Sequence, residues 1–150
     1  MRYVIHHHTA WPNRPDHYDL MLELEAGADP EDLALKTFAS LRDLFPSGVS
    51  HSDTRSRAGQ TGGPTEEVNL LRLINDHRRA YLDYQGPVSR GRGQVQRADA
   101  GTFELLRPLD PGLQEIYLRC AGGKLSGDFR LRHMGQGVYS FERLQRPRPN

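Results

Sequence analysis

The chain has 150 residues, and its 20 basic and 19 acidic side chains nearly cancel, so it fits one domain without a strongly basic nucleic-acid coat or an acidic tail. The single cysteine, Cys120, excludes an internal disulfide framework and a cysteine-rich zinc site. No apolar run is long enough for a transmembrane helix or a signal peptide, and we expect a cytoplasmic protein that does not enter membranes.

The first half of the chain shows the period-two alternation of β-strands. The N-terminal residues continue as a strand through His8, and residues 17–24 form a second strand with one apolar and one more polar face. Residues 33–40 fit a strand or a helix, because residues 29–32, Asp-Pro-Glu-Asp, have the features of a helix start. Residues 46–65 are almost entirely polar, Gly or Pro, which predicts a mobile loop, either an insertion or a functional lid.

The second half contains short apolar segments separated by polar breaks and Gly-containing turns. Strand patterns cover residues 67–74, 94–97, 102–106, 115–120, 124–132 and 138–144, with breaks or turns at 75–79 and 98–101. The Pro- and Arg-rich residues 145–150 predict a disordered tail. Many short strands and little helix predict an all-β, mainly antiparallel barrel or sandwich, formed as a single domain over residues 1–144.

A candidate metal site is found in the first two strands. In a strand, His6 and His8 share one face, and His17 and Asp19 share one face of the next strand. If the strand with His8 lies alongside, two imidazoles and one carboxylate meet, which is typical of a catalytic metal site for Mn²⁺, Fe²⁺ or Zn²⁺. The alternative is that these are ordinary polar residues on a solvated sheet face.

A second cluster of polar residues follows the strand pattern of residues 67–74. Asp76-His77 is followed four residues after the histidine by Tyr81, and a histidine near a metal can bind a phosphate oxygen or protonate a leaving group. The alternative is a surface turn. Gly91-Arg92-Gly93 can form a phosphate-accepting turn, although such glycines also mark ordinary turns and bulges.

Five segments together match one family pattern in order and spacing. They carry a strand ending in histidine, H-[YW]-D-[LF]-x-L-E, D-H-x-x-x-Y, a Gly-rich turn and L-x-G-x-[WF]-x-L. The matching segments are Val4–His8, His17–Glu23, Asp76–Gly86, Gly91–Val95 and Leu125–Leu131. In these segments the chain resembles the 3′-phosphoesterase domain of bacterial DNA ligase D and its stand-alone relatives.

The resemblance implies a small closed or nearly closed β-barrel with short helical or loop insertions, and a Mn²⁺-dependent activity, with Zn²⁺ or another divalent cation as the alternative. Enzymes of this family remove a 3′-phosphate or a 3′-terminal ribonucleoside from a primer end in DNA repair. The implied partners are nucleic-acid 3′ ends of a primer-template and a separate DNA ligase or polymerase, and we expect a monomer. The resemblance implies the metal ligands His8, His17 and Asp19 and the catalytic residues His77 and Tyr81, and it places His6 where the family often has a polar site residue. We expect His6 to bind phosphate, together with Lys36 and Arg72, which lie near two basic positions of the family.

Several positions depart from the family pattern and weaken the phosphate clamp that it implies. Thr37 and Asn69 stand at about the places of a family Lys and a family Arg, and Met21 replaces a basic residue. Lys36 and Arg72 are close to those places, but Lys36 would face the other side of a regular strand. Each missing charged contact to a reacting phosphate costs orders of magnitude in rate.

Two other functions are therefore kept open. A catalytically weak, metal-containing binding module of the same fold would recognise nucleic-acid ends or a repair partner. A cupin-like Fe(II) oxygenase would use His17, Asp19 and a distal histidine, His77 or His133, as its facial triad, and His8 would be dispensable.

Overall fold

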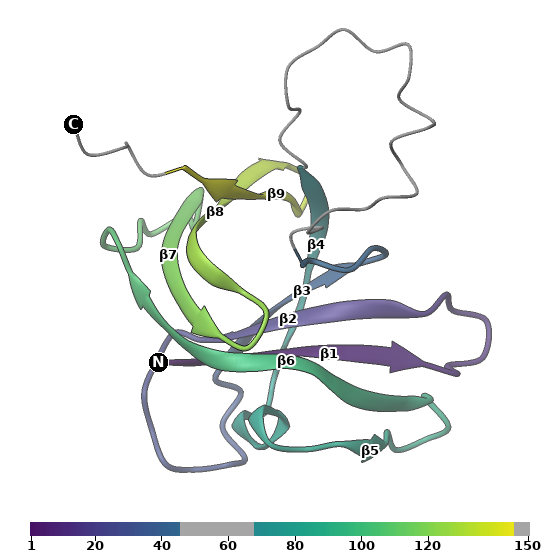
Figure 1. The fold of residues 1–150 in the computed structure, drawn as a ribbon. Helices are drawn as coiled ribbons and strands as arrows, with labels where there is room; N and C mark the ends of the chain where they lie inside the picture. The colour runs from purple at the N-terminus through teal and green to yellow at the C-terminus, as the bar shows by residue number, and fades with distance from the viewer. Residues whose placement is uncertain (46–67, 146–150) are drawn as a thin grey trace, which may run out of the picture.

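The computed structural model describes residues 1–45 and 68–145 (Figure 1). The loop predicted over residues 46–65 lies outside this part of the chain, and so do residues 146–150 of the predicted tail. A short 3₁₀ helix, η2 (Arg79–Leu82), accompanies the strands. The strands are β1 (Arg2–Thr9), β2 (His17–Glu23), β3 (Leu35–Ser40), β4 (Asn69–His77), β5 (Gly86–Pro87), β6 (Gln94–Leu105), β7 (Glu115–Gly122), β8 (Ser126–Gly135) and β9 (Val138–Leu144).

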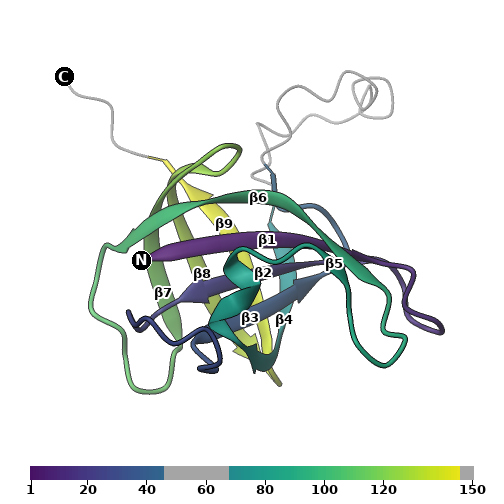
Figure 2. The same cartoon turned by 90° about the horizontal axis from the view of Figure 1, so that it is seen from below.

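The sheet closes into a barrel because β6, near one end of the strand order, also pairs with β1 at the other end. Neighbouring strands follow the order β1-β2-β3-β4-β9-β8-β7-β6, and β6 also pairs with β1. Every pairing is antiparallel, so the eight strands form a closed barrel, and β5 is added outside it on β6 (Figure 2). The predicted all-β antiparallel barrel is confirmed, and the sandwich alternative is wrong.

Strand β6 runs through the segment predicted to turn at residues 98–101. Ala98 packs against the barrel core and Ala100 against a second apolar cluster outside it, so both sides of this segment are covered. At Gly101 a Cβ atom would lie 2.4 Å from the carbonyl oxygen of Ala121 on β7. Gly101 therefore allows the close approach of two strands here, and the glycine does not mark a chain reversal.

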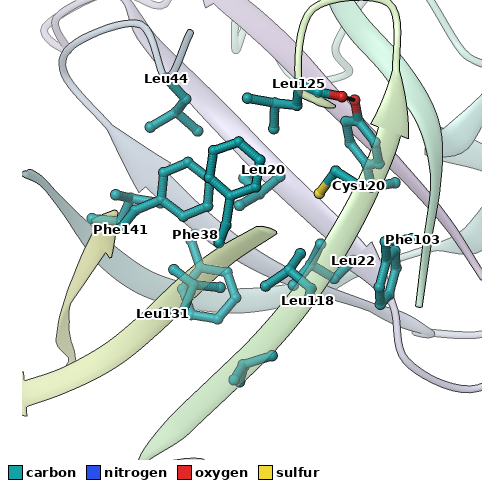
Figure 3. Packing of buried hydrophobic residues seen from close by; sticks show 14 of the residues in the cluster. Leu20, Leu22, Phe38, Leu44, Phe103, Leu118, Cys120, Leu125, Leu131 and Phe141 are labelled. Atoms are coloured by element: carbon teal, nitrogen blue, oxygen red, sulfur yellow. Dashed lines mark hydrogen bonds between the residues drawn. The ribbon is translucent and has the colours of Figure 1, made fainter. Parts of the chain in front are cut away.

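The inner face of the barrel holds the main hydrophobic core. Leu20, Leu22 and Phe38 point inward from β2 and β3 and pack against Leu118 and Leu131 from β7 and β8 (Figure 3). All five side chains are fully buried. Burying one side chain of this kind stabilises a fold by about 1.5–3 kcal/mol, so the interior is a packed core and leaves the outer surface to carry a site.

The outer face of β1–β3 is also covered. Val4, Met21 and Leu35 point to this side and pack with Leu82 of η2, and Tyr81 lies against them. Both faces of β2 are therefore largely buried, whereas the alternation of residues 17–24 predicted one solvated face. The covering residues lie far away in the sequence, so the alternation alone gives no sign of them.

Arg79 fixes η2 on that outer face. Its guanidinium pairs with Glu23 at the end of β2 (Nε to Oε2, 3.0 Å) and with Asp32 (Nη1 to Oδ2, 3.2 Å). It also donates to the carbonyl oxygens of Glu25 and Asp29. Because the arginine is buried, this set of bonds is what makes its charge tolerable there.

Within residues 1–45 and 68–145, no helix has the length and apolarity needed to cross a bilayer.

Residues 35–40 form a strand, and the helix that residues 29–32 also allowed does not form. β3 pairs on one side with β2 and on the other with β4, so both of its edges are hydrogen-bonded. The backbone at Pro30 and Asp32 instead accepts hydrogen bonds from Ala80 and Arg79 of η2. β4 continues to His77, so the break predicted at residues 75–79 begins later than expected.

Candidate metal centre

Three predicted ligands meet on the outer face of β1 and β2. The antiparallel register places His8 opposite His17 and His6 opposite Asp19. His8 Nδ1 lies 3.6 Å from Asp19 Oδ2, and His17 Nε2 lies 3.4 Å from Asp19 Oδ1. One ligand atom from each of the three residues lies within 4.8 Å of the others. The sequence prediction that a strand with His8 would lie beside His17 and Asp19 is therefore confirmed.

Two backbone carbonyls turn the imidazoles toward Asp19. His8 Nε2 lies 2.6 Å from the carbonyl oxygen of Arg92, and His17 Nδ1 lies 3.0 Å from that of Pro15. A carbonyl oxygen only accepts, so each of these nitrogens carries the proton. The unprotonated nitrogens, His8 Nδ1 and His17 Nε2, therefore face the carboxylate with their lone pairs. Outer hydrogen bonds of this kind fix the tautomer of histidine ligands in metal sites.

The arrangement fits a divalent cation. Asp19 Oδ1 is buried and has no hydrogen-bond partner among residues 1–45 and 68–145. The lone pairs of two neutral imidazoles beside a carboxylate repel it unless a positive charge lies between them. The distances of 3.4 and 3.6 Å run to different oxygens of Asp19, and one atom from each of the three residues lies within 4.8 Å of the others, so the three groups are near enough to share one cation. The donor set, two imidazoles and a carboxylate, is one that Zn²⁺, Mn²⁺ and Fe²⁺ accept.

The pKa values of the same groups favour a cation. Burial opposes ionisation of Asp19, but hydrogen bonding from His17 and His8, when these rings carry a proton toward the carboxylate, outweighs burial and lowers the pKa of the carboxyl to about 2. Asp19 in turn raises the pKa of His17, against the effect of burial. Asp19 is thus charged at neutral pH, and it attracts a proton or a metal ion to the imidazole beside it.

The three ligands lie in a groove of about 970 Å³ whose charged lining is mainly positive. Two carboxylates, Asp19 and Asp76, are among the lining residues. The lining arginines are Arg14, Arg72, Arg78, Arg90 and Arg92. Arg78 is paired with Glu31, and Arg92 bonds to Ser89. The groove therefore suits an anionic ligand, because arginine presents several donors to phosphate or carboxylate oxygens.

The two predicted catalytic residues line the same groove. His77, the last residue of β4, bonds through Nδ1 to the carbonyl oxygen of Asn75 (2.9 Å), which leaves Nε2 unprotonated in the neutral ring. Burial lowers the pKa of His77, so this ring is neutral at pH 7. Tyr81 packs its ring edge-on to His77, with 5.5 Å between the centroids. The structure thus brings His77 and Tyr81 to the candidate metal site.

His6 does not take the place predicted for it. Its side chain is completely buried, and it is not among the residues that line the groove. Burial lowers its pKa to about 4, and neither ring nitrogen has a hydrogen-bond partner. Its ring lies edge-on to Tyr81, 6.0 Å between centroids. The prediction that His6 binds phosphate directly is therefore not supported, because a ligand in the groove does not reach a side chain under its floor.

The two predicted basic residues lie on different sides of the sheet. Lys36 shares the side of β3 with the core residue Phe38 and pairs with Asp76 (Nζ to Oδ1, 3.3 Å), and it does not line the groove. Arg72 does line it, and the register puts Arg72 opposite Ala39, which is itself opposite Asp19. Strand alternation thus corrects the prediction for Lys36 and leaves Arg72 as the basic residue of that pair at the site.

Sequence reasoning missed Trp11 and Arg14, which lie in the loop between β1 and β2 and line the groove. The Trp11 ring stacks on His8, with 5.1 Å between centroids and 21° between planes. A signal was present, because the only tryptophan of the sequence lies between the two predicted histidine ligands. His133, an alternative ligand in the oxygenase hypothesis, lies on β8 beside Gln114 and does not line the groove.

The sequence matches no protein-family model and none of the curated proteins. What the protein does is therefore inferred from its own residues.

Proposed function

We propose that the chain is a metal-dependent phosphoesterase that acts on nucleic-acid 3′ ends and removes a 3′-phosphate or a 3′-terminal ribonucleoside. The observation that carries the proposal is the convergence of His8, His17 and Asp19 on the outer face of the barrel, in a groove lined by arginines. A cation held by these ligands would bind one oxygen of a phosphate ester, and the surrounding guanidinium groups would donate hydrogen bonds to its other oxygens. The resemblance in five segments supports a nucleic-acid end as the carrier of that phosphate.

The ligand set suits Mn²⁺, and Zn²⁺ or another divalent cation is the alternative. When bound, the cation would polarise a phosphoryl oxygen and lower the pKa of a bound water. In phosphomonoester hydrolysis, water adds to phosphorus, the bond from phosphorus to the 3′-oxygen breaks, and that oxygen takes up a proton. The products are inorganic phosphate and a 3′-hydroxyl, which a separate ligase or polymerase would use.

Arg72 is the arginine that we assign to the phosphate. Within the part of the chain that the structure describes, its guanidinium makes one long hydrogen bond, from Nη1 to the carbonyl oxygen of Gln136 (3.5 Å), so most of its donors remain for a ligand. It occupies the same outer side of the sheet as Asp19, two strands away. Arg90 also lines the groove and has no ion pair within the described residues. These residues would take over the charge that the family pattern places at other positions.

His77 is assigned to proton transfer. It is neutral at pH 7 when the groove holds no anion, because burial lowers its pKa. A phosphate dianion nearby would favour the imidazolium, so the ring would gain a proton as the substrate binds. From there it can donate to a phosphate oxygen or to the departing 3′-oxygen. Tyr81, packed against the ring, holds its orientation.

A binding module with little catalysis remains the second candidate. Lys36 and His6 do not line the groove, Lys36 is paired with Asp76, and Met21 packs against Leu82 of η2, so three positions near the site offer no free charge to a reacting phosphate. The oxygenase hypothesis is less well supported. Among the described residues, the cluster able to hold a metal contains His8 and not the distal His77 or His133 that the hypothesis requires.

The test is trimming of a 5′-labelled primer-template whose primer ends in a 3′-phosphate or a single 3′ ribonucleotide, with and without Mn²⁺. We expect Mn²⁺-dependent removal by the wild type and by His133→Ala, whose histidine lies outside the groove. His17→Ala and Arg72→Gln should lose most of the activity, Arg72→Gln with metal affinity intact. Absence of trimming by metal-loaded wild type would overturn the enzyme proposal and favour the binding module.

A further inference from the structure

The loop from Ala10 to Asp16 carries an aromatic side chain directly beside the candidate metal ligands. Trp11 stacks on the ring of His8 and also lies near His17, 6.5 Å between centroids. Arg14 places its guanidinium carbon 4.5 Å from the centre of the Trp11 ring. The side chains of Arg14, Trp11 and His8 thus form one layered group at the wall of the groove, and none of their stacking contacts is needed to hold a metal.

The loop is held in place by backbone contacts. The Ala10 N–H donates to Asp16 Oδ1 (3.2 Å), and the Arg14 N–H donates to the carbonyl oxygen of Trp11 (3.1 Å). Across the groove wall, Gly93 lies so near that a Cβ there would be 2.1 Å from the carbonyl oxygen of Thr9. Gly93 also has a φ of +81°, which favours glycine. Trp11 is therefore set in position by the fold.

Arg14 is a charged residue with spare capacity. Within the described residues it makes no ion pair, and its stacking on Trp11 leaves its N–H donors free. It lines the same groove as His8, His17 and Asp19. A planar cation on an aromatic ring beside a metal centre is suited to a ligand with an anionic part and a flat, stacking part.

We propose that Trp11 and Arg14 bind the terminal nucleoside of a nucleic-acid end whose phosphate lies at the metal centre, the base stacking on the exposed Arg14 guanidinium that the Trp11 ring supports. The inference rests on the proposed function and adds to it the recognition of a base. A simple phosphomonoester would use only the cation and the arginines. Stacking of one base on an aromatic side chain contributes enough to change affinity by roughly tenfold or more.

The test compares two oligonucleotides that end in a 3′-phosphate and differ in one feature, a terminal nucleotide with a base or without one. Their binding to the Zn²⁺-loaded protein is followed by anisotropy of a 5′ fluorescent label, and the ends are checked on a gel after the titration. We expect the wild type to bind the base-bearing end about tenfold more tightly. Because Trp11 is the only tryptophan, its emission should change with the base-bearing end and much less with the abasic end.

Trp11→Leu should lose the preference for the base, since leucine keeps apolar volume and removes the stacking surface. Arg14→Gln is the second variant, in case Trp11→Leu does not fold, and it should also reduce the preference. Arg90→Gln is the matched control, because it removes a groove arginine that is not stacked on Trp11 and should weaken both ends alike. Unchanged discrimination in Trp11→Leu, with Zn²⁺ affinity retained, would overturn the inference.

The same data separate the two proposals. A wild-type protein that prefers the base-bearing end and trims neither substrate would support nucleoside binding and overturn the enzyme proposal. A wild-type protein that trims both ends with equal affinity and equal efficiency would support the enzyme and overturn the role of Trp11 and Arg14. Failure to bind either oligonucleotide would overturn both.

Discussion

Two buried aspartates of this barrel, Asp19 and Asp99, differ in where their hydrogen bonds come from. Asp99 accepts from the hydroxyl of Tyr3 (2.6 Å) and from the backbone N–H groups of Lys124 and Leu125 (both 2.9 Å). Asp19 has one oxygen without any hydrogen-bond donor and faces two imidazole lone pairs. A carboxylate whose donors all come from the chain holds a turn, whereas one that lacks them fits the proposed role of binding a cation.

The largest expected effect is that of Asp19→Asn on metal binding. The amide loses the charge that holds the cation, so affinity for Zn²⁺ or Mn²⁺ should fall by more than about 100-fold, since even an outer partner of a metal ligand is worth 10–100-fold. Isothermal titration calorimetry on the folded variant measures this. If Asp19→Asn bound the metal as well as the wild type, Asp19 and Asp99 would not differ in the way described.

Asp99→Asn should have the opposite effects, a lower free energy of unfolding and an unchanged metal affinity. An amide group facing the N–H groups of Lys124 and Leu125 cannot accept from all three donors, so the free energy of unfolding should fall by about 2–3 kcal/mol. Urea denaturation followed by circular dichroism gives that value. Zn²⁺ affinity should not change, and a loss of metal binding here would blur the distinction between the two carboxylates.

The pH dependence of stability should contain a contribution from His6. Its pKa falls from 6.5 in the unfolded chain to about 4 in the fold, because burial penalises the charged ring. A depressed histidine pKa stabilises the fold fully above pH 6.5, and this stability is lost as the pH falls toward 4. In metal-free protein, His6→Leu should therefore reduce the loss of unfolding free energy between pH 7 and pH 4 by up to about 3 kcal/mol.

The comparison with the wild type controls for the titration of His17, which is present in both proteins. The raised pKa of His17 acts with the opposite sign, because its stability is present at low pH and is lost as the pH rises through the folded pKa. His17 is the same in both proteins, so the difference between the two pH curves isolates His6. Parallel curves for wild type and His6→Leu would show that the buried ring takes up its proton as easily as in the unfolded chain.

The smallest effect is expected for Lys36→Gln. The pair that Lys36 makes with Asp76 is partly exposed, and such pairs contribute at most about 1 kcal/mol. Unfolding free energy should change by no more than this amount, and metal affinity and trimming should stay as in the wild type. A large loss of trimming would mean that Lys36 reaches the phosphate after all.

The barrel and the meeting of His8, His17 and Asp19 could be predicted because their signals are local. The alternation around His17 and Asp19 specifies which side chains share a face, and antiparallel pairing of neighbouring strands brings His8 alongside. The sequence patterns also predict short strands and turns for most of the barrel. These features depend on spacing within a few residues, which a single sequence contains.

The remaining features depend on contacts between residues that are distant in the chain. Whether the outer face of β2 is solvated is decided by η2, which Arg79 fastens to Glu23. That covering places His6 under the floor of the groove. β6 continues as a strand through residues 98–101, where a turn was expected, and Gly101 lets it approach β7 closely. Neither the covering nor the close approach leaves a periodic signal in the sequence.

The proposed ligands all lie between residues 8 and 19, at the open end of a single hairpin. A cation there would close a short loop that strand pairing already brings together, so it would remove little disorder from the unfolded chain. The barrel, whose core lies on the other face, does not depend on it. The protein should therefore stay folded when a chelator removes the metal. Binding and release of the ion would then not require the chain to unfold.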